Sequence, residues 1–168
     1  MSKIERKLMA HFIDAGFGVK GESEPTYTPK WVRLGKDLEE FNIELNPDTE
    51  TSKNILGEST FKHNGYEVSA DADPYYADKD DPLFTKLQDI VDNRKSGDDC
   101  KTSALEVHMW DAGSSEGTYV AYQQDCYVVP TSYGGDTSGY QIPFSVYYTG
   151  ERVKGTYSMA TKTFTADT

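Results

Sequence analysis

Alternation of polar and apolar residues dominates the second half of the chain. Every second residue shares a face in residues 101–109, and residues 119–129 and 140–148 alternate in the same way. A period of two residues is typical of a strand that is buried on one face. Gly150 then predicts a turn into a last short strand at residues 153–158. We therefore expect a β-meander after Lys101.

The first half of the chain gives a weaker strand pattern. Residues 31–34, 40–45 and 66–73 are predicted strands, whereas residues 46–64 are polar with little periodicity. This stretch is predicted to be a long loop, and long loops in compact domains are usually functional. Its one apolar island is Ile55–Leu56, which is expected to pack either on its own domain or on a neighbouring copy of the chain.

One helix interrupts the strands, at about residues 82–95. Asp81 is a good N-cap and Pro82 suits the first helical position. Arg94 and Lys95 suit the negative end of a helix, and Gly97 is expected to stop it. Five apolar residues fall on one stripe, which predicts the face that packs on the sheet. They are Leu83, Phe84, Leu87, Ile90 and Val91.

Two parts are expected along the chain. Residues 1–29 are predicted to be an N-terminal arm, with glycines and prolines and one short amphipathic turn. Residues 30–168 are predicted to form a single domain. The strand pattern with one helix predicts a mainly β fold of the α+β kind, either a β-sandwich or a barrel with a flanking helix.

Charge is unevenly distributed over the 168 residues. The formal net charge is −11; residues 1–36 carry seven bases against four acids, and residues 37–99 carry six bases against 17 acids. Nucleic-acid affinity comes largely from Lys and Arg that neutralise phosphates, so this chain is a poor candidate for sequence-specific DNA binding. The asymmetry suits a well-solvated surface, or a basic segment of one copy that meets an acidic face of the next.

Motifs for catalysis and metal binding are missing from the sequence. His11, His63 and His108 are far apart, and no HExxH, CxxC or GxSxG pattern occurs. The aspartates from Asp71 to Asp81 do not fit an EF-hand, because a proline stands where the twelfth-position glutamate is needed. We therefore predict that the protein is not an enzyme and binds no metal or other cofactor.

Cysteine usage and hydropathy narrow the class of protein further. Cys100 and Cys126 are expected to be reduced, because the first residues lack a secretory-signal pattern. No apolar run approaches the roughly 20 residues that span a bilayer, so no membrane association is expected. The mean hydropathy is −0.68. The chain nevertheless has 12 Tyr and 7 Phe, which argues for a folded protein rather than a disordered one.

Four short motifs, in their order and spacing, resemble those of the tail tube proteins of tailed phages and prophages of Gram-positive bacteria. The likeness extends from about Trp31 to Thr168, and none of the motifs is catalytic. The motifs are Asn54-Ile55-Leu56-Gly57, Tyr75-Tyr76-Ala77, Leu87-Gln88-Asp89-Ile90-Val91 and Ser132-Tyr133-Gly134-Gly135-Asp136.

The resemblance implies a structural virion protein with a tail-tube β-sandwich or barrel. Copies would form hexameric rings that stack into a hollow tube, through which DNA passes without specific binding. The loop at residues 46–64 would reach the adjacent ring, with Asn54, Ile55, Leu56 and Gly57 as its self-association segment. Acidic residues within 37–99 would partly line the lumen. The protein would be assembled in the bacterial host cytoplasm and reside in the virion tail.

The same resemblance implies partners and leaves alternatives open. Other tail proteins would contact the tube: the tape measure, baseplate or tail-completion proteins and, in a contractile tail, a sheath. The inner tube of a phage-tail-like bacteriocin or contractile injection system, a tail terminator and a decoration protein are related alternatives. A carbohydrate-binding β-sandwich is an alternative of another class. Its stacking platform would be Trp31, Trp110, Tyr147 and Tyr148.

Overall fold

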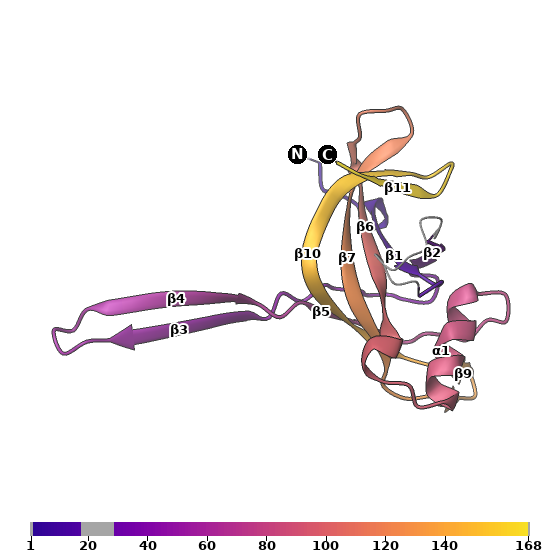
Figure 1. Ribbon diagram of the computed structural model, residues 1–168, viewed down its shortest axis with the longest axis horizontal. Coiled ribbons are helices and arrows are strands. Elements are labelled where there is room, and N and C mark those ends of the chain that lie inside the picture. The colour runs from indigo at the N-terminus through magenta and orange to yellow at the C-terminus, as the bar shows by residue number, and fades with distance from the viewer. Residues whose placement is uncertain (1, 18–28, 168) are drawn as a thin grey trace.

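A single curled antiparallel sheet dominates the computed structural model, which describes residues 2–17 and 29–167 (Figure 1). The strand order is β11-β10-β7-β6-β1-β2, and β5 pairs with the N-terminal end of β10, whereas β11 pairs with its C-terminal end. The strands are β1 (Met9–Asp14), β2 (Trp31–Leu34), β5 (Ser69–Ala72), β6 (Lys101–Ala112), β7 (Thr118–Pro130), β10 (Phe144–Ser158) and β11 (Thr163–Ala166). The prediction of a mainly β fold is confirmed.

Two hairpins and one α-helix complete the described part of the chain. The hairpins are β3 (Pro47–Lys53) with β4 (Ser59–Tyr66), and β8 (Gly134–Asp136) with β9 (Gly139–Gln141). The helix α1 (Pro82–Asp92) and the 3-10 turns η1 (Arg6–Leu8) and η2 (Gly97–Cys100) lie outside the sheet. The β3–β4 hairpin extends from one side of the sheet and α1 lies on the other side (Figure 1).

The sheet is buried on both faces, with a separate apolar cluster on each. Residues such as Ile13, Leu87 and Val128 form a cluster that includes α1. Phe12 and Leu105 belong to the second cluster. Successive residues of a strand point to opposite faces, so β1 contributes to both clusters and its residues from Ala10 to Asp14 are all buried.

The helix begins where the sequence predicts and ends earlier. Asp81 Oδ1 accepts a hydrogen bond from the Leu83 amide at 2.9 Å, and Pro82 stands in the first turn. The helix ends at Asp92 rather than near residue 95, because Arg94 adopts a left-handed conformation with φ of 47°. The buried residues of the predicted stripe are Leu83, Leu87, Ile90 and Val91, and Phe84 packs against the same core while partly buried.

The N-terminal segment is not the arm predicted for residues 1–29. Residues 9–14 form strand β1 between β2 and β6, where Phe12 lies opposite both Arg33 and Leu105. The prediction failed because a strand buried on both faces shows no alternation of polar and apolar residues. Residues 18–28 of the predicted arm lie outside the described residues.

The strand predicted at residues 40–45 is also wrong. Only a single bridge forms there, between Glu44 and Ser69, while Phe41 is buried in the core beside His11. The strand predicted at residues 66–73 is divided, because Tyr66 ends β4 and β5 begins at Ser69.

The C-terminal strands differ from the prediction in two places. Gly150 does not turn the chain: β10 continues through it with a register shift between Thr149 and Val153, and Gly150 has φ of 70°. Tyr140 belongs to β9, which ends before β10 begins. The sheet curls without closing, with β2 at one edge, so it forms an open half-barrel.

Candidate functional site: the projecting hairpin

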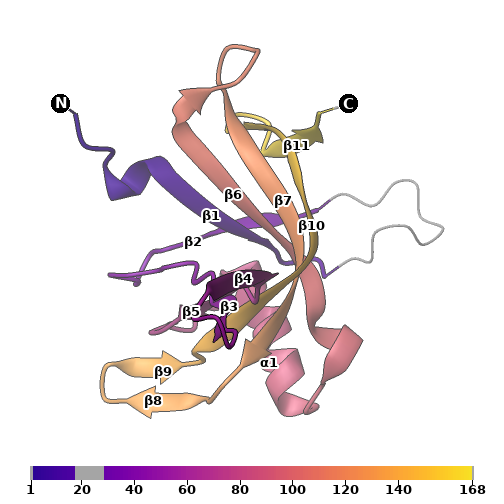
Figure 2. The same cartoon turned by 90° about the vertical axis from the view of Figure 1, so that its left-hand side faces the viewer.

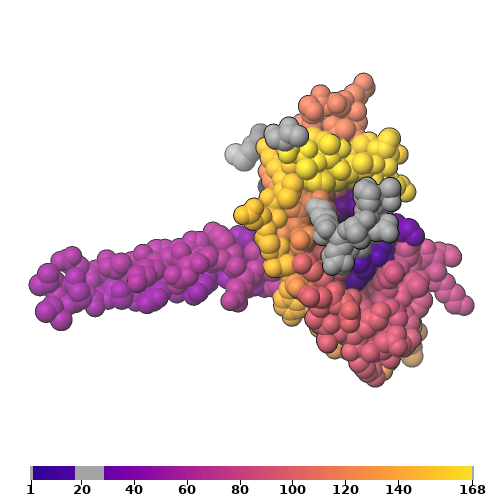
Figure 3. All heavy atoms as spheres, viewed as in Figure 1, coloured from indigo at the N-terminus to yellow at the C-terminus, as the bar shows by residue number. Residues whose placement is uncertain are grey.

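Residues 46–64, predicted to be a loop, lie mostly in a projecting β-hairpin. The strands β3 and β4 pair antiparallel from Pro47 opposite Tyr66 to Lys53 opposite Ser59. Every residue of the two strands is exposed except Gly65, which is half-buried. The space-filling view shows the hairpin standing clear of the domain (Figure 3). Because an isolated two-stranded hairpin is marginally stable at best in water, this element lacks the burial that would stabilise it.

The tip of the hairpin is a closed turn. The Asn54 carbonyl accepts from the Gly57 amide at 3.0 Å. The Asn54 side-chain oxygen accepts from the amides of Leu56 at 2.9 Å and Glu58 at 3.0 Å. Gly57 has φ of 80°, which glycine adopts without strain. These bonds give the tip a defined shape.

The tip carries apolar side chains where turns normally carry Gly, Pro, Asn, Asp or Ser. Ile55 and Leu56 occupy the two central positions, and their exposed fractions are 102% and 76%. Of the two alternatives left open by the sequence, packing on the same domain is wrong. The predicted self-association segment, Asn54 to Gly57, forms the turn at the end of the hairpin, and these four residues are called the tip.

The two faces of the hairpin differ. Phe61 lies opposite Thr51 on one face and is exposed. On the other face, Glu50 lies opposite Lys62, and such cross-strand pairs of opposite charge stabilise a hairpin modestly. Nearer the domain, the His63 and Tyr66 rings contact edge-on, with ring centroids 4.6 Å apart. Local pairs therefore hold the hairpin together without burying it.

Asn46 fixes the hairpin where it leaves the domain. Its side-chain amide donates to the Glu67 carbonyl at 2.9 Å and to the Ser69 hydroxyl at 3.1 Å. Its φ of 44° is a left-handed conformation that asparagine tolerates better than most residues. The sequence did not indicate that the Asn46 side chain joins the two chain segments.

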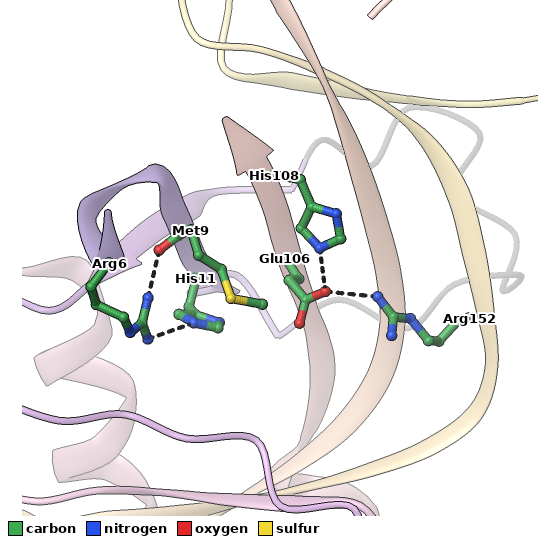
Figure 4. A network of polar contacts seen from close by, with 6 residues as sticks. All are labelled: Arg6, Met9, His11, Glu106, His108 and Arg152. Carbon is green, nitrogen blue, oxygen red and sulfur yellow. Dashed lines mark hydrogen bonds and ion pairs between the residues drawn. The ribbon is translucent and has the colours of Figure 1, made fainter. Parts of the chain in front are cut away.

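A network of titratable side chains also lies at the sheet (Figure 4). Glu106 Oε2 lies 2.7 Å from His108 Nε2 and 2.8 Å from Arg152 Nη2. Beside it, Arg6 Nη2 lies 2.9 Å from His11 Nε2. Burial, followed by the charge of Arg6, lowers the pKa of His11 to about 4. A general base works best with a pKa near the operating pH, so His11 is poorly suited to that role at neutral pH.

The two thiols are equally poor candidates for covalent chemistry. Cys100 and Cys126 are free and buried, and their reduced state in the cell stays a prediction. Burial raises the pKa of both thiols, which keeps them protonated and weakly nucleophilic. In residues 2–17 and 29–167, no group of three or more His, Cys, Asp or Glu could hold a metal ion. No helix in those ranges is long and apolar enough to cross a bilayer.

The aromatic platform of the carbohydrate-binding alternative does not assemble. Trp31 and Tyr148 are partly buried against different core clusters. Trp110 stacks on His108, with ring centroids 4.6 Å apart. Tyr147 is next to Tyr148 on β10 and therefore points to the opposite face of the sheet. No common surface unites the four rings.

The acidic residues within 37–99 lie on several elements, including the hairpin, the segment before α1, α1 itself and η2. Which of them line a channel stays a prediction. No protein-family model matches the chain, and no curated protein matches it either. The hairpin geometry is therefore the feature from which a function can be inferred.

Proposed function

We propose that this protein is a structural subunit of a phage tail tube, which self-assembles through its hairpin into stacked rings around a channel for DNA. The observation that carries the proposal is the fully exposed hairpin with Ile55 and Leu56 at its tip. The sequence resemblance supports the hexameric ring, the other tail proteins as partners, and a place in the virion tail. It also supports the tail-tube version of the β fold.

The hairpin has the reach and the chemistry for a contact between copies. Seven paired residues at about 3.3 Å each extend roughly 20 Å, enough to cross a gap between neighbouring domains. Burying Ile55 and Leu56 against a partner would contribute about 1.5–3 kcal/mol for each side chain. A weak contact of this size becomes strong when a ring repeats it several times in parallel.

The shape of the chain favours contacts that propagate. In Figure 2 the hairpin points toward the viewer and α1 lies at the back. A hairpin that binds a different surface of the next copy makes a heterologous contact, and such contacts continue along an axis without closing. The net charge of −11 suits a conduit because an acidic surface repels the DNA that has to slide past it.

The inner tube of a phage-tail-like bacteriocin or contractile injection system is a second candidate that the hairpin supports equally. Its subunits would stack in the same way, and only the passage of DNA distinguishes the two. Capsid and DNA-packaging genes beside the gene for this protein would favour the phage tube. A neighbourhood with tail genes and no capsid genes would favour the bacteriocin.

Replacing Leu56 by Asp tests the proposal. A charged tip cannot be buried in an apolar site without a large desolvation cost, so Leu56→Asp is expected to stay a folded subunit that does not stack. Sedimentation velocity would report the loss of large assemblies, and circular dichroism would report the intact fold. The matched control, Leu56→Met, keeps an apolar tip and should assemble normally. Assemblies of normal length from Leu56→Asp would overturn the proposal.

A further inference from the structure

An apolar groove lies beside the C-terminal end of α1. Its volume is about 660 Å³, and it lies between α1, η2 and the neighbouring ends of β7 and β10. Three of its lining residues are large and open to solvent: Val129, Tyr133 and Tyr147, at 39%, 50% and 49% exposure. Val91 contributes from the helix side. Val129, Tyr133 and Tyr147 are thus left partly uncovered by the described residues of their own chain.

The groove is held open by contacts of its own walls. Arg94 Nη2 donates to the Tyr133 hydroxyl at 2.9 Å, and the guanidinium carbon lies 5.3 Å from the centre of that ring. Arg94 Nη1 donates to the Val91 carbonyl at 2.8 Å, which ties Tyr133 to the end of the helix. On the other wall, the Tyr127 hydroxyl donates to Asp98 at 3.1 Å. A preformed groove loses little conformational freedom when it is filled, so even a small ligand can bind.

We infer that this groove receives the hairpin tip of the next copy of the chain. The inference rests on the proposed self-assembly and assigns the surface that the tip contacts. The tip is a narrow, closed turn with two uncovered aliphatic side chains, and the groove is lined by uncovered aliphatic and aromatic ones. Charge is complementary as well: Glu58 follows the tip, and the Arg94 guanidinium lies in the groove. The hydrogen-bond partners of Arg94 there are a hydroxyl and a backbone carbonyl, whereas Lys95 is already paired with Asp89 at 2.6 Å.

The position of the groove agrees with a contact that runs head to tail. It includes the end of α1, on the side of the sheet away from the hairpin (Figure 1). One copy can therefore donate its tip and accept another tip at the same time. A smaller pocket of about 340 Å³ includes Leu45 and Tyr66 at the base of the hairpin. That pocket lies where the chain's own hairpin begins, so a tip arriving from the opposite side would not meet it.

Disulfide trapping between the tip and the groove tests the inference. Leu56→Cys is combined with Val129→Cys in one chain, and Leu56→Cys with Tyr147→Cys provides a second groove position. The matched control is Leu56→Cys with Val153→Cys, because Val153 is another strand valine with 37% exposure but lies outside the groove. Each protein is checked for assembly by sedimentation before mild oxidation. Leu56→Cys alone reports any reaction with the native Cys100 at the groove wall.

A ladder of cross-linked dimers, trimers and longer species in both groove variants, lost in the Val153 control, is the expected result. Normal assembly with no ladder from either groove variant would overturn the groove and leave the proposed self-assembly standing. Equal cross-linking in the Val153 control would also overturn the assignment of the groove as the surface that binds the tip. Cross-linked dimers without longer species would overturn the head-to-tail contact. Absence of assembly in the unmodified protein, also after seeding with preformed tail tubes or baseplates, would overturn the proposed function together with this inference.

Discussion

The sheet domain and the hairpin are built from the same kind of strand but reach opposite degrees of burial. Leu87 in the domain has 0% exposure, whereas Leu56 at the tip has 76%. In the domain, β6 and β7 pair on both edges and pack on both faces, while the hairpin has two strands and no buried residue. The domain can therefore be stable alone. The hairpin has no such burial within its own chain, and we propose that a second copy supplies it.

Polar groups follow the same division. In the described parts of the domain and hairpin, no buried side-chain nitrogen or oxygen lacks a hydrogen-bond partner. On the sheet, the largely buried Glu106 carboxylate pairs with the exposed Arg152, whereas both Glu50 and Lys62 of the hairpin are exposed to water. The buried polar groups of the domain are therefore satisfied within the chain, whereas exposed charged pairs on the hairpin contribute little to stability.

The largest expected effect separates two chemically identical substitutions. Leu87→Ala removes a fully buried side chain and leaves a cavity, so it should lower the free energy of unfolding by about 2–5 kcal/mol. Leu56→Ala removes an exposed side chain and should change the free energy of unfolding by less than about 0.5 kcal/mol. Urea unfolding of the unassembled subunit, followed by circular dichroism, measures both. A similar loss from the two variants would mean that the tip is packed on its own domain.

A second prediction concerns pH and the buried His11. Its pKa of about 4 lies below the ordinary 6.5, so the unfolded chain binds the proton more readily between these values. The free energy of unfolding should therefore fall as pH drops from about 6.5 to 4, by about 3 kcal/mol from this residue. Among the charges near His11, Arg6 lowers the pKa of His11 further, whereas Glu106 raises it.

The comparison of His11→Gln with the unchanged protein across that pH range isolates the contribution of His11. The variant should lose less stability on acidification than the unchanged protein. His63→Gln, on the exposed hairpin, removes a histidine outside the sheet, and the steep loss of stability should persist. The prediction is contradicted if His11→Gln and the unchanged protein show parallel curves.

The smallest expected effect is confined to the base of the hairpin. Asn46→Ala removes the side-chain hydrogen bonds to Glu67 and Ser69 and strains a left-handed backbone. Together these changes should lower the free energy of local opening at the hairpin base by about 1–3 kcal/mol. Asn46→Gly removes the bonds but tolerates the backbone, so its effect should be smaller. Hydrogen exchange should become faster for amides in residues 47–66 and stay unchanged in β6 and β7. Equal acceleration in β6 would show that the hairpin and the sheet unfold together.

Much of the fold follows from the sequence where the two faces of an element differ in polarity. The alternation in β6 and β7 and the cap at Asp81 predicted those elements correctly. The pattern failed for β1, which is buried on both faces, and for the hairpin, which is exposed on both. A period of two residues becomes visible only when the two faces of a strand differ. Gly150 was wrongly predicted to form a turn, because a bulge and a turn require the same backbone freedom.

The candidate site could be predicted only in part. The apolar pair in a polar stretch drew attention to Ile55 and Leu56, because apolar residues need cover. Their position at the tip of a projecting hairpin depends on the pairing of β3 with β4, which the sequence did not reveal. The groove could not be predicted at all. Val91, Val129 and Tyr147 come from three separate elements, and only the folded chain brings them together.

Electron microscopy of the purified, concentrated protein, with its mass measured by light scattering, tests the central claim most directly. The claim is that the exposed hairpin of one copy is covered by the next copy in a stack. Hollow filaments, or stacked rings with a central channel, are the predicted result. A protein that remains a monomer at every concentration, and also when seeded with preformed tail tubes or baseplates, would contradict it.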